Sequence, residues 1–383
     1  MWPWSTGGSS PNWLRKRWSW LPLPSFEAPR LLPSLEYLDT LSDSTGVIQH
    51  ATLDIPNRST GYCTDDVARA LIVVCQKLAI DPRDKIAKRL APVYLAYLAD
   101  AQLPDGRFHN FMSYDRQWLD CVGTHDSVGR ALWALGFGMR FAPRATWRRL
   151  CKRLFDKGRK ALDWLQHPRS QSYAMIGLAH AIASDPPRGE LPIYKEDLRT
   201  LAEALKTRYE QTQARDWVWF ENILTYDNAR LPEAMLRAGT ALQDDEYVAI
   251  GLRTFAFYEH VTVENGILVP IGNEGWYARG GQRARYSQQP LEAVSLVDAA
   301  LAAYEATGEA AFQATAQIGL EWYYGRNSRG IVMANDGGCL DGLNETSVNH
   351  NMGAESTLAF LSSAYTLATS LHVARTIVGT LFT

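Results

Sequence analysis

Acidic residues stand at the starts of several apolar helical segments, and their carboxylates are the groups best suited to chemistry in this chain. The four candidates for catalysis are Asp66, Asp126, Glu221 and Asp227. Each lies beside aromatic or histidine residues, where a long loop meets an apolar segment. Neighbouring carboxylates push each other's pKa values apart, which yields one protonated acid and one ionised base near neutral pH. Cleavage of a glycosidic bond uses that combination.

A carboxylate in the first turn of a helix also has a structural interpretation. It can cap backbone N–H groups, or it can pair with an arginine one turn later. Four pairs have the required spacing: Asp65–Arg69, Asp66–Arg69, Asp126–Arg130 and Asp227–Arg230. This interpretation stays open for each acid alone. It does not account for the Trp, Tyr, His and Asn residues that surround the acids as a group.

Aromatic residues are abundant, with 13 Trp and 17 Tyr. Aromatic rings can stack on the apolar faces of sugars, while Asn, Gln, Arg and His can bind the hydroxyl groups. Trp217, Trp219, Trp276 and Tyr62 are the stacking candidates, and ordinary packing is the alternative for each of them. The candidate substrate-binding residues are Tyr62, Asp65, His125, Trp219, Trp276, Arg285, Gln289, Glu292, Asn349 and Glu355.

Composition and charge exclude several classes of protein. The 383 residues carry a formal net charge of −2, and 46% of them are hydrophobic, as in an ordinary globular protein. A nucleic-acid-binding protein would need a surplus of basic residues. No apolar run reaches the roughly 18 residues of a membrane span. We therefore expect a cytoplasmic protein with no nucleic-acid partner and no membrane span.

Metal and cofactor motifs are missing from the sequence. The five cysteines form no CxxC pair, which favours reduced thiols in a cytoplasmic protein. His50, His109, His125 and His350 lack the HxH or HExxH spacing of metal ligands. No GxGxxG or GxxxxGK[ST] motif indicates a nucleotide site. The sequence therefore predicts no metal and no cofactor.

Helical periodicity dominates the chain. Six segments are apolar on nearly every face, which indicates helices buried on both sides. They begin near Thr64, His125, Ser170, Asp227, Ser287 and Gly353. Amphipathic segments alternate with them at about 28–41, 84–102, 145–166, 194–213, 242–260 and 309–327. Six successive helical hairpins predict an all-α fold, an (α/α)6 toroid with parallel inner helices over residues 28–383. A Trp- and Pro-rich N-terminal arm is expected at 1–27.

Long loops precede the inner helices, whereas the turns from inner to outer helices are short. The long loops lie at about 42–63, 103–123, 214–225, 261–286 and 328–349. Because the inner helices of a toroid are parallel, these loops must gather at one mouth. Long connections without regular structure usually carry function. The mouth is therefore the predicted place of the site.

Four stretches, in order, carry a family resemblance: GVIQHATLDIPNRSTGYCTDDVARALIV, WFENILTYDNARLPEAML, RYSQQPLEAVSLVDAAL and NMGAESTLAFL. They resemble a bacterial family of toroidal domains that are fused to, or encoded beside, glycosyltransferases. The resemblance covers roughly residues 30–372. More distantly, the layout resembles the six-hairpin glycoside hydrolases and sugar epimerases. It implies a carbohydrate context and a glycosyltransferase as a partner.

Three functions remain open. The carboxylates and aromatics favour a carbohydrate-active enzyme, a glycoside hydrolase, phosphorylase or related glycosyl-transferring enzyme with an oligosaccharide or glycoside substrate. A sugar epimerase-like isomerase would use His125 or His350 as its base. A non-catalytic saccharide-binding partner of a glycosyltransferase would need the aromatic residues but not several carboxylates at one mouth.

Overall fold

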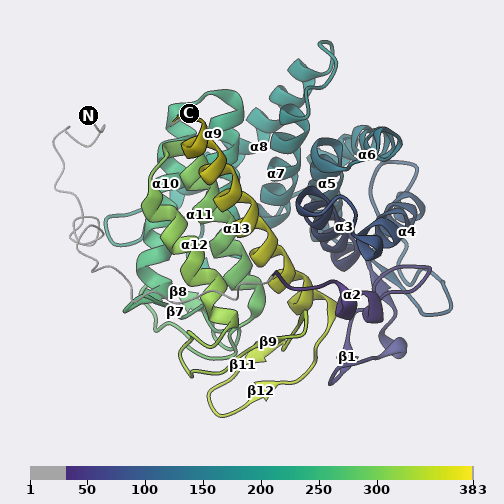
Figure 1. Ribbon diagram of the computed structural model, residues 1–383. Helices are drawn as coiled ribbons and strands as arrows, with labels where there is room; N and C mark the ends of the chain where they lie inside the picture. Colours follow the sequence, from purple (N-terminus) through teal and green to yellow (C-terminus); the bar gives the residue numbers. More distant parts are fainter. Residues whose placement is uncertain (1–31, 382–383) are drawn as a thin grey trace.

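Two rings of helices make up the chain (Figure 1). The computed structural model describes residues 32–381, so the arm predicted at 1–27 lies outside the described residues. The inner helices are α3 (Thr64–Ile80), α5 (His125–Phe141), α7 (Pro168–Ala183), α9 (Arg230–Leu242), α11 (Pro290–Thr307) and α13 (Ala354–Leu381). The outer helices are α2 (Glu36–Leu41), α4 (Lys85–Ala101), α6 (Ala145–Gly158), α8 (Leu191–Thr212), α10 (Asp245–Thr262) and α12 (Ala310–Tyr323).

Neighbouring inner helices contact each other around a complete circle. The contacts run from α3 through α5, α7, α9 and α11 to α13, and α13 packs back against α3. The short outer helix α2 contacts both α13 and α4, so it lies beside the junction of the first and last inner helices. This closed order confirms the predicted (α/α)6 toroid of six hairpins.

Inner helices are packed on every side, as their sequences predict. In α11, every residue from Pro290 to Ala303 is buried. Helices α5 and α7 approach so closely that a Cβ added at Gly136 would lie 2.1 Å from the carbonyl oxygen of Gly177. The outer helix α6 is amphipathic instead, and it turns Trp147 and Cys151 towards the core. Glycine at 136 is thus required because two backbones meet there.

Several helix ends differ from the prediction for local reasons. Helix α6 ends at Gly158, and a 3₁₀ helix, η3 (Arg159–Trp164), replaces the rest of the segment predicted at 145–166. Helices α7 and α11 begin with proline, which suits the first helical position because its missing N–H is not needed there. Helix α9 begins after Asp227, because that residue has a left-handed φ of 48°.

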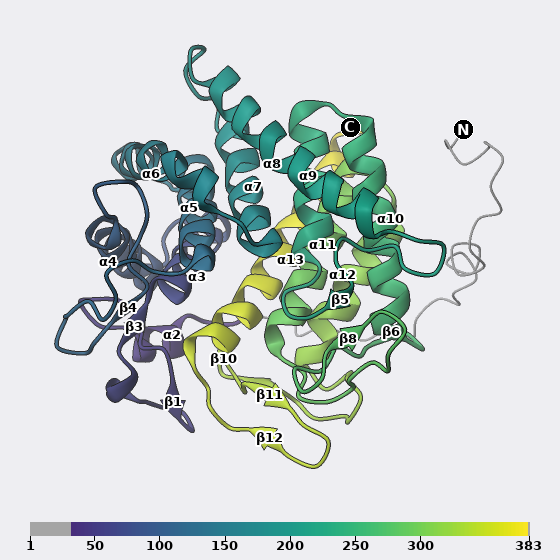
Figure 2. The ribbon, with the colours of Figure 1, turned by 180° about the vertical axis from the view of Figure 1, so that it is seen from behind.

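Short strand pairs form within and between the long loops, at the end where the inner helices begin (Figures 1 and 2). Six two-residue strand pairs form there: β1 (Ala51–Thr52) with β2 (Ile55–Pro56), β3 (Tyr62–Cys63) with β4 (Phe111–Met112), β5 (Ile223–Leu224) with β8 (Tyr277–Ala278), β6 (Val263–Glu264) with β7 (Ile267–Leu268), β9 (Ala334–Asn335) with β10 (Gly338–Cys339), and β11 (Gly342–Leu343) with β12 (Val348–Asn349). A bridge between Gln288 and Leu343 joins the loops before α11 and α13. The long loops therefore share one mouth, as predicted.

Two further expectations concern the chain as a whole. None of the helices in the described region has the length and apolar character that a membrane span requires. All five cysteines are free thiols, and Cys121 alone among them is exposed.

Candidate active site

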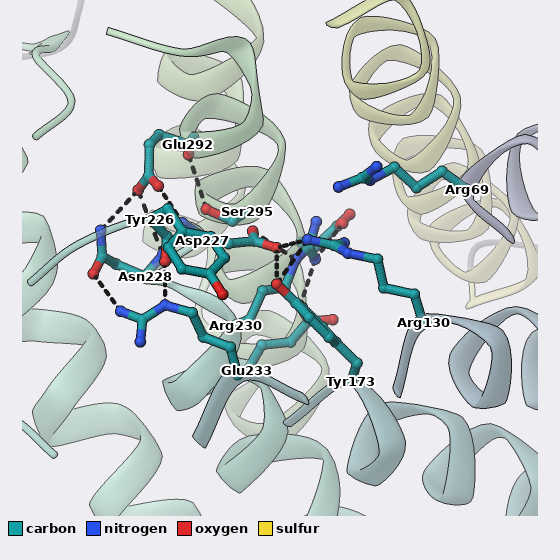
Figure 3. Close-up of polar contacts among 12 residues, drawn as sticks. Arg69, Arg130, Tyr173, Tyr226, Asp227, Asn228, Arg230, Glu233, Glu292 and Ser295 are labelled. Atoms are coloured by element: carbon teal, nitrogen blue, oxygen red, sulfur yellow. Dashed lines mark hydrogen bonds and ion pairs between the residues drawn. The ribbon is translucent and has the colours of Figure 1, made fainter. Parts of the chain in front are cut away.

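The polar residues at the mouth form a connected group, which we call the axial cluster. Its members are Asp65, Asp66, Arg69, Asp126, Arg130, Tyr226, Asp227 and Glu355. They come from α3, α5 and α13 and from the turn before α9. Figure 3 shows the contacts around Asp227. The cluster unites five acids that the sequence placed on four different hairpins.

Asp227 lies fully buried between two arginines. Its Oδ2 accepts hydrogen bonds from Arg130 Nη2 at 2.8 Å and from the Tyr173 hydroxyl at 2.7 Å. Its Oδ1 accepts from Arg230 Nε at 3.2 Å. Burial by itself raises the pKa of Asp227, but the charges of Arg230 and Arg130 lower it below its ordinary value. Asp227 is therefore an ionised anchor that fixes Arg130 (Figure 3).

Glu292 on α11 supports the turn that carries Tyr226 and Asp227. It accepts hydrogen bonds from the backbone N–H of Asp227, from Asn228 Nδ2 at 3.1 Å and from the Tyr258 hydroxyl at 2.8 Å. Burial, together with the charge of Asp227, raises the pKa of Glu292 to about 7. These contacts hold the left-handed backbone at Asp227. Glu292 therefore supports the turn that carries Tyr226 and Asp227 and is not a member of the axial cluster.

Arg69 joins the first inner helix to the last. Its Nη1 donates to Asp66 Oδ1 at 2.8 Å, and its Nη2 donates to Glu355 Oε2 at 2.6 Å. Asp66 is buried and also accepts a contact from Cys63 Sγ at 3.2 Å. Burial raises the pKa of Asp66, and the positive charge of Arg69 opposes that rise. Asp66 and Glu355 thus hold Arg69 from two sides.

Asp65 and Asp126 are less constrained than the other acids of the cluster, and both are partly exposed. Asp126 Oδ2 accepts a hydrogen bond from the Tyr226 hydroxyl at 2.7 Å. Burial raises the pKa of Asp65 to about 6, although the nearby charges of Arg130 and Arg69 lower it. Its buried Oδ1 has no hydrogen-bond partner among the described residues.

Glu221 lies outside the cluster and is linked to it through Arg169. Arg169 Nη1 donates to Glu221 Oε2 at 2.8 Å, and Nη2 donates to Asn228 Oδ1 at 3.2 Å. The Nε of Arg169 donates to the carbonyl oxygen of Tyr226. Glu221 therefore stabilises the arginine that holds the turn before α9.

The predicted aromatic residues divide into buried and accessible ones. Trp217, Trp219 and Tyr62 are buried, so they offer no open ring face, and the stacking expected of them is corrected to packing. The Trp219 ring, for example, stacks on Tyr258 with ring centroids 6.0 Å apart. Trp276 is partly exposed in the loop before α11. Trp276 therefore remains the stacking candidate among these four.

Three predicted binding residues, Arg285, Asn349 and Gln289, are not members of the axial cluster. Arg285 is exposed and makes two contacts of 2.8 Å with the carboxylate of Glu264. Asn349 Nδ2 donates to Asp341 Oδ2 at 3.1 Å. Gln289 is the residue before α11, and its side chain makes no capping hydrogen bond. Within residues 32–381, none of the three hydrogen-bonds to the axial cluster.

The two histidines considered as bases differ in their surroundings. His125, the first residue of α5, stacks on Trp164 with ring centroids 4.0 Å apart and meets the edge of His167. Burial, followed by the effect of His167, lowers the pKa of His125. His350 is exposed in the loop before α13. Of the two histidines, His125 is therefore the one whose side-chain position is fixed by neighbouring rings.

Sequence reasoning named the acids of the cluster but did not treat its arginines as site residues. The predicted i, i+3 pairs Asp66–Arg69 and Asp227–Arg230 form. The two predicted i, i+4 ion pairs do not form among the described residues. Arg130 instead reaches across the ring to Asp227, and Arg69 pairs with Asp66 and Glu355. The signal for the arginines was available, since DDVAR and DSVGR repeat an arginine one turn after the acids.

A metal site has no support in the described region, where no three His, Cys, Asp or Glu residues are grouped to hold an ion. The expectation of no metal and no cofactor stays a prediction.

Comparisons with known proteins place the fold. No family model matches the sequence, and neither does any curated protein. Similar solved structures include a sugar epimerase from a ruminal bacterium, with a TM-score of 0.64 and 12% identity over 86% of this chain and 94% of that one. A cellobiose 2-epimerase from Bacillus thermoamylovorans matches at 0.63 and 12%, over 86% and 96%. A GH76 α-mannanase from Bacteroides thetaiotaomicron matches at 0.62 and 11%, over 89% and 95%. The shared feature is the toroid, and neither a family model nor a curated relative supports the expected link to a glycosyltransferase.

Proposed function

We propose that this chain is a carbohydrate-active enzyme that acts on a glycosidic bond at the axial cluster, with Asp65 as general acid and Asp126 as the partner carboxylate. The state of Asp65 carries the proposal, because its pKa is raised to about 6 and its Oδ1 has no hydrogen-bond partner in the part of the chain that the structure describes. A carboxylic acid with such a pKa keeps its proton in a useful fraction of molecules near neutral pH. Solved structures of the same fold, described as epimerases and a mannanase, make saccharides the first class to test.

The proposed reaction needs no group beyond the two carboxyls and water. Asp65 donates its proton to the glycosidic oxygen as the bond from that oxygen to the sugar carbon breaks. Asp126 removes a proton from the water that attacks the same carbon, so Asp65 ends ionised and Asp126 protonated. Tyr226, which donates to Asp126 at 2.7 Å, orients that carboxylate. Transfer to phosphate or to a second sugar would replace the water.

The other acids expected to be catalytic are assigned supporting roles in this proposal. Asp66 is held by Arg69 and Asp227 by Arg130, so a proton transfer at either acid would break an ion pair. Glu221 is engaged by Arg169 outside the cluster. Asp126 is the one candidate of the original four that keeps a catalytic role.

The test is a screen of oligosaccharides and aryl glycosides for newly formed reducing ends, with and without phosphate. Asp65→Asn and Asp126→Asn should each lower kcat about 10²–10⁴-fold, the range for loss of a general acid or base. Asp245→Asn is the matched control, because Asp245 is exposed at the start of α10, away from the mouth. Wild-type turnover by both mouth variants would rule out the assignment.

A second candidate, a sugar epimerase or isomerase, has the support of one observation. His125 has a lowered pKa, a buried Nδ1 without a partner among the described residues, and a position next to Asp126. A neutral imidazole can remove a proton from a carbon beside a sugar carbonyl. Reactions in D₂O distinguish the two proposals, because epimerisation incorporates carbon-bound deuterium without releasing a new reducing end.

The third function, a non-catalytic saccharide-binding partner of a glycosyltransferase, is the outcome if saccharides bind without turnover. Calorimetry with the sugars of the same screen detects that result. It would leave Trp276 and the polar side chains of the mouth as binding groups, and the carboxylates as structural ones.

A further inference from the structure

Two arginines at the centre of the mouth retain unused N–H groups. Arg130 is only 3% exposed and uses Nη2 to bind Asp227, while its Nη1 has no partner among the described residues. Arg69 uses both terminal nitrogens for carboxylates, and its buried Nε is likewise unpartnered within residues 32–381. In Figure 3 both side chains extend in the same direction, towards the side of the view where Asp227 lies. Buried donors are rarely left unsatisfied, so these nitrogens call for an acceptor.

The charge around these donors decides which acceptor fits. Carboxyl groups surround them on every side: Asp65, Asp66, Asp126, Asp227 and Glu355. Arg69 and Arg130 already have carboxylates as ion-pair partners, so neither offers an uncompensated positive charge. Arg230 also pairs with Asp227, so three arginines face these five acids, and the surrounding stays negative even when Asp65 is protonated. An incoming carboxylate or phosphate would therefore meet net repulsion.

A neutral hydroxyl group meets every requirement of the unpartnered atoms. Its oxygen can accept hydrogen bonds from Arg69 Nε or Arg130 Nη1, and its own proton can be donated to Asp65 Oδ1. Adjacent hydroxyls on a sugar ring supply several such groups at once.

We propose that Arg69 and Arg130 form a subsite that selects uncharged saccharides and discriminates against uronates and sugar phosphates. Arginine pairs ordinarily favour anionic ligands. Here the surrounding carboxyl groups reverse that preference while leaving the directional N–H donors in place. The inference rests on the proposed function in one respect, that a saccharide is the ligand.

The first test compares matched sugars by titration calorimetry at low ionic strength. Three sets share a ring: glucose, glucuronate and glucose 6-phosphate, and the corresponding compounds of mannose and galactose. We expect a neutral sugar to bind, and its two anionic relatives to bind at least about tenfold more weakly. Added salt should reduce the difference in affinity between the neutral and the anionic sugars, because screening weakens charge repulsion. An anionic member that binds as tightly as its neutral relative would overturn the proposal, as would a lack of binding by all three neutral sugars.

The second test removes the free donors but keeps the positive charges. Arg69→Lys and Arg130→Lys can still pair with the neighbouring carboxylates, so both proteins should fold with wild-type circular dichroism. Each should weaken binding of the neutral sugar about 10–100-fold, as expected for a lost hydrogen bond to a charged group. Arg199→Lys is the control, because Arg199 is half-exposed on the outer helix α8 and pairs with Glu196 there.

A deoxy sugar makes this test specific. The wild-type protein should bind the analogue that lacks the contacted hydroxyl only weakly. The lysine variant should bind this analogue as tightly as the wild-type protein does, since the contact is absent in both cases. If both lysine variants bind neutral sugars as wild type does, ordered water satisfies the arginines and the subsite is refuted. Arginine-dependent binding without turnover would retain the subsite and end the proposed enzymatic function. Turnover of a saccharide, together with unchanged sugar binding in both lysine variants, would support the proposed enzymatic function and refute the subsite.

Discussion

Replacing Asp227 with asparagine measures how strongly one buried charge holds the mouth together. Among the described residues, Asp227 is the carboxylate in ion-pair contact with Arg130, whereas Arg230 has two other carboxylate partners. The substitution therefore strands one buried guanidinium. Asparagine tolerates a positive φ, so the turn itself is not strained. Stranding one member of a buried ion pair costs about 3–5 kcal/mol, and the other acids near Arg130 place our expectation near 3 kcal/mol.

Urea unfolding at pH 7, followed by circular dichroism, gives the free energy of unfolding for each variant. Tyr173→Phe is the comparison, because it leaves both charges in place and removes a hydroxyl that donates to Asp227 and accepts from Arg130; it should cost about 0.5–1.5 kcal/mol. Adding Arg130→Met to Asp227→Asn should recover part of the loss, since no stranded charge remains. A loss below about 1 kcal/mol for Asp227→Asn would refute the view that this ion pair anchors the turn.

Three further predictions test packing, binding and pH dependence. Gly136→Ala should lower the free energy of unfolding by about 1–3 kcal/mol or more in urea unfolding, because its Cβ would meet the α7 backbone. The control is Gly189→Ala, whose Cβ would lie in open space and whose free energy of unfolding should stay within about 0.5 kcal/mol of wild type. Trp276→Ala should weaken saccharide binding by about 1–3 kcal/mol in calorimetry with the melting temperature retained, whereas Trp219→Ala should instead destabilise the fold by about 3–5 kcal/mol. Burial raises the pKa of Glu292 from 4.5 to about 7, so the folded protein binds a proton at Glu292 more tightly than the unfolded chain does. The stability that this proton contributes is therefore lost as pH rises from about 4.5 to 7. In urea titrations over that range, Glu292→Gln should remove a slope of up to about 1.4 kcal/mol per pH unit, and an unchanged slope would contradict the prediction.

The ring could be predicted because its signals are local. The stretch Pro290–Thr307 is apolar on nearly every face, which identifies a helix with neighbours on both sides, and the structure buries every residue from Pro290 to Ala303. The repeat of DDVAR and DSVGR places Asp65 and Asp126 at equivalent points of adjacent hairpins, and Asp66 follows Asp65 directly. Parallel inner helices then bring both acids to one mouth, which explains why the candidate acids converge.

The roles of individual residues could not be predicted, because they depend on contacts across the ring. Arg130 has an acid one turn away at Asp126, yet it binds Asp227, 97 positions further along the chain. Trp219 has the neighbours expected of a sugar-stacking residue, but Tyr258 from α10 covers its ring. Such choices follow from three-dimensional packing, which leaves no periodic trace in the sequence.

The contact between Arg69 and Glu355 has a consequence for the timing of synthesis. The two residues are 286 positions apart, so a ribosome that adds about 5–20 residues per second makes them roughly 15–60 s apart. Throughout that interval Arg69 can pair with Asp66 on its own helix, but Glu355, whose ion pair with Arg69 joins α13 to α3, has not yet been synthesised. The mouth is therefore assembled last, and a nascent chain that has completed five of its inner helices still lacks one wall of its central site.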